Sequence, residues 1–200
     1  MTIKNVSIGL GALVAGIMVV PGRGESQVCP PSPAVCRTAG SSVFTFKNRA
    51  DPNNNRLVWR WLKGEATTTA EFLDPTTTVT TALCLYAGTA ASLIGEATLP
   101  PSASLWHVGE NVGADGEKIW YKDPSAATDG VRYVLLRSGG AGDARIIVKA
   151  RGAATPSVAT PFLSLPLIVQ LHQDDGPPCW GSTFTAARVN TATKFKSKSP

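Results

Sequence analysis

Four cysteines are the residues of this 200-residue chain with the most readily assigned chemistry. Cys29, Cys36, Cys84 and Cys179 form no Cys-x-x-Cys motif and have no nearby pair of histidines, so zinc ligation is not expected. In an oxidising compartment they allow three disulfide connectivities. A short proline-rich loop could close between Cys29 and Cys36, which favours that pairing and leaves Cys84 to pair with Cys179.

Two histidines are the candidates for general-base chemistry. The sequence around His107 and His172 supplies no nucleophile and orienting acid of the kind that a catalytic triad needs. Glycosidases need two carboxylates at a definite separation, and the sequence alone gives no such distance. A glycine-rich phosphate loop and a nucleophile elbow are both missing from the sequence. We therefore expect no enzymatic activity and no cofactor, with a secreted hydrolase as the less favoured alternative.

One polar loop has the first half of a calcium-binding pattern. Asp51, Asn53 and Asn55 stand at its first, third and fifth positions, where oxygen ligands are required. Arg56 occupies the sixth position, where such loops need Gly, and Leu62 occupies the twelfth, where they need Glu. The stretch is therefore interpreted as a polar turn, and no metal site is predicted.

Aromatic side chains offer a different chemistry, because a ring exposed on a sheet can stack on a sugar ring. The candidates are Trp59, Trp61, Trp106, Trp120 and Tyr121, together with Tyr133 and Trp180. Large aromatic side chains are also frequent core residues, so core packing is the alternative for each. The sequence favours a non-catalytic structural, adhesion or accessory module, with a carbohydrate-binding module as the alternative function.

Short β-prone segments separated by turn signals must position these residues. Ten are expected, at 42–47, 56–62, 79–87, 92–99, 105–108, 118–122, 131–137, 144–150, 165–171 and 179–185. Strict alternation places Leu57, Trp59 and Trp61 on one face of a strand. The sequence therefore predicts an all-β fold, an antiparallel two-layer β-sandwich of the jelly-roll type with about ten strands. A closed β-barrel is the alternative architecture.

The N-terminus has the pattern of a secretory signal peptide. A basic residue, Lys4, precedes the apolar run 6–20, which a turn-forming stretch follows. This run is shorter than the about 20 residues that span a membrane. We expect residues 1–24 to be the signal peptide, 25–41 a segment rich in Pro and Cys, 42–186 the β-sandwich domain and 187–200 a basic tail. The mature protein is expected to be extracellular or periplasmic, without a transmembrane segment.

The formal net charge of +5 is unevenly distributed along the chain. Residues 25–187 hold 13 Lys or Arg and 14 Asp or Glu, so the excess positive charge lies at the two ends. Nucleic-acid binding needs basic residues gathered on a folded face. No nucleic-acid partner is therefore expected. The sequence does not identify the partner, and the candidates are a glycan or an envelope protein.

Several short motifs together resemble a family of uncharacterised secreted bacterial β-domains. They are Trp59-Arg60-Trp61-Leu62-Lys63-Gly64, Asp74-Pro75-Thr76-Thr77, Leu83-Cys84-Leu85-Tyr86, the stretch 145–152, and Cys179-Trp180. The similarity covers roughly residues 43–196. Family members often carry a further cysteine pair in the region that matches Pro100 to Trp106, and this chain has none there. The resemblance implies an exported β-sandwich and no chemistry, since no activity is known for the family.

Overall fold

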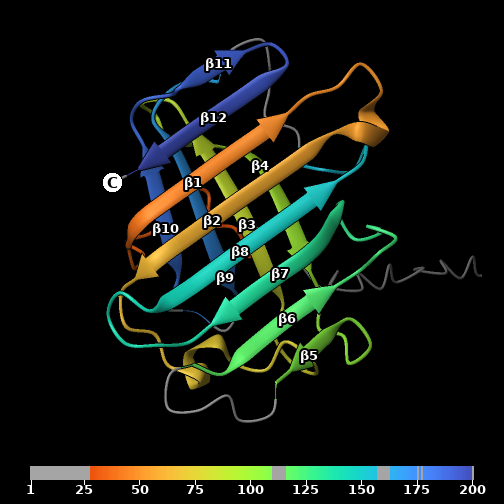
Figure 1. The fold of residues 1–200 in the computed structure, drawn as a ribbon, viewed down its shortest axis with the longest axis vertical. Coiled ribbons are helices and arrows are strands. Elements are labelled where there is room, and N and C mark those ends of the chain that lie inside the picture. Colours follow the sequence, from red (N-terminus) through yellow and green to blue (C-terminus); the bar gives the residue numbers. More distant parts are fainter. Residues whose placement is uncertain (1–27, 110–115, 157–162, 175, 177, 200) are drawn as a thin grey trace, which may run out of the picture.

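The computed structural model describes residues 28–109, 116–156, 163–174, 176 and 178–199. Two antiparallel sheets face each other and do not close into a barrel (Figure 1), which confirms the predicted sandwich. The expected signal peptide, 1–24, lies outside the described residues. Among the residues described, none of the helices has the length and hydrophobicity that crossing a membrane requires.

The larger sheet has eight strands and the smaller sheet has four. The order in the larger sheet is β11 (Val189–Thr191), β12 (Lys194–Ser199), β1 (Ala39–Lys47), β2 (Arg56–Gly64), β8 (Ala144–Arg151), β7 (Val131–Arg137), β6 (Lys118–Lys122) and β5 (Trp106–Val108). The order in the smaller sheet is β10 (Trp180–Phe184), β9 (Leu167–Gln173), β3 (Thr81–Ala87) and β4 (Ser92–Leu99). Two short 3-10 helices, η1 (Pro52–Asn54) and η2 (Thr69–Phe72), lie in the connections.

Alternation along β2 explains how the larger sheet contributes to the core. Leu57, Trp59 and Trp61 are fully buried, as their spacing predicts. A buried indole needs a partner for its N–H, and two of these partners lie across the sandwich in β10. Trp61 donates to the backbone carbonyl of Gly181 at 3.1 Å, and the Trp59 N–H lies 3.2 Å from the Ser182 hydroxyl. These bonds hold the two layers together in a fixed register.

The C-terminal residues belong to the larger sheet, so the expectation of a basic tail over 187–200 was wrong. β12 pairs with β1 along its whole length, with Phe46 opposite Phe195. Phe195 and Ser197 are buried, whereas Lys196 and Lys198 are exposed. This alternation is typical of a strand with one face on the core. Its lysines are also residues that protect strands near a sheet edge from pairing with other chains.

Residues 28–37, which we call the N-terminal strap, lie on the outer face of the smaller sheet. The Tyr86 hydroxyl donates to the carbonyl of Pro30 at 2.9 Å. The Gln170 side chain accepts from the amide of Ala34 at 3.1 Å and donates to its carbonyl at 2.7 Å. All seven residues of β3 are buried, because its inner face meets the larger sheet and its outer face meets the strap.

Two disulfides fix the strap to the smaller sheet. Cys29 is bonded to Cys84 in β3, and Cys36 is bonded to Cys179, next to β10. The expected pairing of Cys29 with Cys36 and of Cys84 with Cys179 was therefore wrong. The physical reason is that the strap runs across the sheet instead of closing on itself, which brings each of its cysteines to a different strand. The two disulfides indicate an oxidising environment, extracellular or periplasmic.

Burial of His172 predicts a pH-dependent stability. Its imidazole lies on β9, 9% exposed, 2.9 Å from the Gln170 side-chain oxygen, and burial lowers its pKa. Below about pH 6.5 the unfolded chain binds a proton that the folded protein does not, so the free energy of unfolding falls as the pH drops. Urea unfolding between pH 7.5 and 5 should show this loss, and His172→Gln should reduce it. An unchanged pH dependence in His172→Gln would contradict the prediction.

Candidate functional site

Positive charge is concentrated in the larger sheet. Its eight strands contain 14 Lys or Arg residues and no Asp or Glu. The four strands of the smaller sheet contain no Lys or Arg and a single acid, Glu96. The near-neutral formal charge of residues 25–187 therefore conceals a marked separation of charge. The net excess of positive charge lies at the two ends of the chain, as the sequence indicates, but within the fold the Lys and Arg residues are gathered in the larger sheet.

Strand alternation turns these basic side chains away from the core. In β2 the exposed positions include Arg56, just before the buried Leu57, and Arg60, between two buried tryptophans. In β8 the exposed positions are Arg145 and Lys149. Successive side chains of a strand point to opposite faces, so a strand that buries its apolar set presents its basic set to solvent. The outer face of the larger sheet, turned toward the viewer in Figure 1, is consequently basic.

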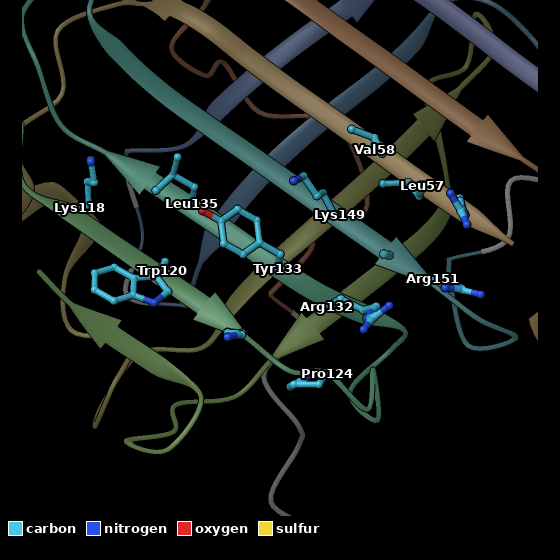
Figure 2. Close-up of a pocket in the computed structure, with 13 residues that line it drawn as sticks. Leu57, Val58, Lys118, Trp120, Pro124, Arg132, Tyr133, Leu135, Lys149 and Arg151 are labelled. Carbon is cyan, nitrogen blue, oxygen red and sulfur yellow. The ribbon is translucent and has the colours of Figure 1, made fainter. Parts of the chain in front are cut away.

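A groove of about 810 Å³ lies on this outer face over β2, β8, β7 and β6 (Figure 2). Its volume is in the usual range of ligand pockets. Six cationic residues line it: Arg56, Lys118, Lys122, Arg132, Lys149 and Arg151. The rest of its lining is apolar or aromatic: Leu57, Val58, Trp120, Pro124, Tyr133, Leu135 and Ala150. We call this surface the aromatic groove.

Two half-buried rings form part of the floor of the aromatic groove. Trp120 pairs with Leu135 of β7, and Tyr133 lies two residues before Leu135 on the same strand. Such diagonal neighbours are about 7 Å apart and remain within reach of one ligand. Figure 2 shows both rings broadside to the viewer, on the solvent side of their strands. A flat apolar ligand surface can therefore contact both.

The rings also position charged and polar groups. The Lys149 ammonium lies 5.0 Å from the centroid of the Tyr133 ring, at the distance of a cation–π contact. His107 lies in β5, directly opposite Trp120 of β6, and the centroids of their rings are 5.5 Å apart at an interplanar angle of 31°. Lys149 is thereby placed over the floor of the groove before a ligand arrives. An anionic group that binds there meets a cation whose conformation is already restricted.

Several cations face one another directly across adjacent strands. The register places Lys194 opposite Lys47, Lys47 opposite Arg56, and Arg56 opposite Arg151. Like charges in such positions destabilise a sheet. Among the described residues, Arg37 forms an ion pair with Glu71, and neither residue belongs to this row of cations. Arrangements that lower stability in this way are characteristic of functional surfaces.

Relief of this repulsion gives a prediction with two readouts. Arg56→Gln should raise the free energy of unfolding by about 0.5 kcal/mol at low salt, since Arg56 faces cations on both sides. The gain should shrink in high salt, which screens charges at the surface. Urea unfolding at two salt concentrations measures the effect. A variant that is less stable than the wild type at low salt would contradict the description of this row as repulsive.

The structure divides the aromatic candidates into two groups. Trp59, Trp61, Trp106, Tyr121 and Trp180 are all buried in the core, none of them more than 1% exposed. They cannot stack on a ligand, because each side chain is buried among core residues. Trp120 and Tyr133 lie on the outer face and are brought together in the aromatic groove. Of the aromatic candidates, only Trp120 and Tyr133 are therefore placed where they could stack on a sugar ring.

The other candidate residues are separated in space or engaged in the fold. His107 lies in β5 of the larger sheet, and His172 lies in β9 of the smaller sheet. The Asp51 carboxylate accepts from the Asn53 amide at 3.0 Å and the Asn55 side chain accepts from the Arg49 amide at 2.8 Å. These contacts are those of a polar turn, as the sequence predicts for that loop.

His172 also lies beside a disulfide, in the one group of potential metal ligands found among the described residues. The ligand atoms of Cys36, His172 and Cys179 are all within 4.8 Å of one another. Because the two sulfur atoms are bonded to each other, neither is a thiolate, and the thiolate is the form that binds metal. In the oxidised protein this cluster therefore acts as a structural crosslink.

Both rings of the site are among the aromatic candidates that the sequence indicates, whereas the cations around them are not predicted from it. Lys149 and Arg151 lie in the stretch 145–152, whose family resemblance implies no chemistry, and Arg132 lies in no motif. The near-zero formal charge of residues 25–187 gave no sign of a basic surface. The sequence does contain a signal for the basic surface: the outward positions of β2, β6 and β8 are repeatedly Lys or Arg. Comparison of the chain with protein-family models, with curated proteins and with solved structures gives no match.

Proposed function

We propose that the protein is an exported, non-catalytic module that binds an acidic carbohydrate in the aromatic groove. The main observation in support of this proposal is that two solvent-facing aromatic rings and six cationic side chains line the same groove. Acidic sugars present an apolar ring face and a carboxylate or sulfate at its edge. The groove offers a counterpart to each of these features in Trp120, Tyr133 and Lys149.

The chemical character of the groove supports binding as its role. Its cations are donors without acceptor capacity, and its rings and aliphatic side chains supply contact area. Such groups hold a charged ligand and exclude water from part of it. Electrostatic attraction by the whole face also raises the local concentration of anions and speeds their association. These properties suit a module that attaches a protein or a cell to an acidic matrix.

The oxidising environment favours a glycan over a nucleic acid as the ligand. Both disulfides indicate such an environment, and polysaccharides are abundant polyanions outside cells. Single-stranded nucleic acid is bound by a similar combination of basic grooves and aromatic rings. It is therefore included in the test as the competing ligand.

The test is a direct binding measurement on the purified full chain with both disulfides formed. Isothermal titration with oligogalacturonate, with a neutral glucan oligomer and with single-stranded DNA should give saturable binding of the acidic sugar and weak or no binding of the neutral one. DNA should bind less tightly than the acidic sugar at physiological salt. Tighter binding of DNA, or no binding of any acidic sugar, would overturn the proposal.

A further inference from the structure

A second groove adjoins the aromatic groove on the same face. It has a volume of about 310 Å³ and is lined by Val43, Thr45, Lys47, Arg56, Val58, Arg60 and Lys196. Arg56 and Val58 of β2 line both grooves, so the two meet along this strand. We call this surface the second groove. It extends the basic face from β2 over β1 to β12.

The register connects the two grooves in one row of side chains. Reading across the sheet, Lys196 faces Thr45, Thr45 faces Val58, and Val58 faces Lys149. Lys149 then faces Tyr133, which in turn faces Lys122. Cations therefore stand at both ends and near the middle of the row, with Thr45, Val58 and Tyr133 between them. The row crosses six strands, about 24 Å at the usual spacing of strands.

Resting on the proposed function, we infer that the ligand is a linear acidic polysaccharide that crosses the strands and occupies both grooves at once. A mono- or disaccharide that contacts Trp120 and Tyr133 is too short to reach Arg60 or Lys196 as well. A polymer with one anionic group per repeat brings a charge to each groove. The second contact is then intramolecular, which raises the affinity without stronger contacts at either groove.

The test compares ligands of two lengths on a variant of the second groove. The variant carries Arg60→Gln and Lys196→Gln, both at exposed outward positions. The control carries Ser92→Glu and Thr183→Glu, at exposed positions of the smaller sheet, and has the same net charge. Isothermal titration uses a galacturonic acid disaccharide and a long oligogalacturonate, with concentrations expressed per sugar repeat.

For the long ligand, the variant of the second groove should raise Kd at least tenfold, and its affinity should depend less on salt. The disaccharide should bind the wild type and this variant with Kd values within about twofold, since Arg60 and Lys196 lie outside the aromatic groove. The control should resemble the wild type with both ligands. Equal loss with both lengths, or no loss with the long ligand, would overturn the inference. If no acidic sugar of either length binds, the proposed function itself fails.

Discussion

Replacement of Trp120 by alanine is expected to raise the Kd for an acidic oligosaccharide about 30-fold, the effect of losing about 2 kcal/mol at a central aromatic contact. Trp120 lines the groove between β6 and its neighbours, while its side chain is only half-buried. The substitution therefore removes a contact surface and leaves the core tryptophans in place. Isothermal titration gives the affinity, and near-UV circular dichroism reports whether the fold is retained.

A matched control for this variant is Val35→Ala. Val35 is a fully exposed apolar residue of the N-terminal strap, on the opposite side of the sandwich. Its truncation should leave the affinity unchanged, because it lies on the smaller sheet and far from the groove. If a correctly folded Trp120→Ala protein bound the acidic oligosaccharide as tightly as the wild type, the aromatic groove would not be the binding site.

Removal of the Cys36–Cys179 disulfide should have the largest effect on stability. The double variant Cys36→Ala with Cys179→Ala is expected to lower the free energy of unfolding by about 4 kcal/mol. The two cysteines are 143 residues apart in sequence, so the bond strongly restricts the unfolded chain. Urea unfolding of the oxidised wild type and of the variant provides the measurement.

The second disulfide provides the comparison for this prediction. Cys29 and Cys84 are 55 residues apart, so removal of their bond should cost about 1 kcal/mol less in the chain-entropy description. Under conditions where either variant is folded, its affinity for the acidic sugar should match that of the wild type, because the strap covers the other sheet. A disulfide variant that is folded and has lost affinity would contradict the separation of the two faces.

The sequence contains enough information for most strands of the fold. Leu57, Trp59 and Trp61 alternate with polar or basic residues, and this pattern alone identifies the buried face of β2. β12 was missed because Phe195 is its one large apolar residue and its three lysines suggested a solvated tail. The disulfide pairing could not be derived, since it depends on the path of the strap across the smaller sheet.

The candidate site was harder to predict than the fold. Trp59 and Trp120 both lie in short strands. Whether such a ring is in the core or at the surface depends on which side chains of its strand point toward the other sheet, and only the folded structure shows this. The basic face was hidden because acids and bases balance over residues 25–187. The acidic residues near the larger sheet lie in the loops that connect its strands, while the basic residues lie in the strands themselves. The summed formal charge of the chain does not reveal this separation of acids from bases. Assigning the facing of each basic residue along its strand would have revealed it.

The most direct test of the account is to map the ligand on the protein through its five tryptophan side chains. In a nitrogen–proton correlation spectrum each indole N–H gives one signal. Trp59, Trp61 and Trp180 donate to partners inside the sandwich, and Trp106 is buried. Titration with oligogalacturonate should shift the Trp120 signal and leave the other four nearly unchanged. Shifts confined to the core tryptophans or to the N-terminal strap, with Trp120 unaffected, would contradict binding on the outer face of the larger sheet.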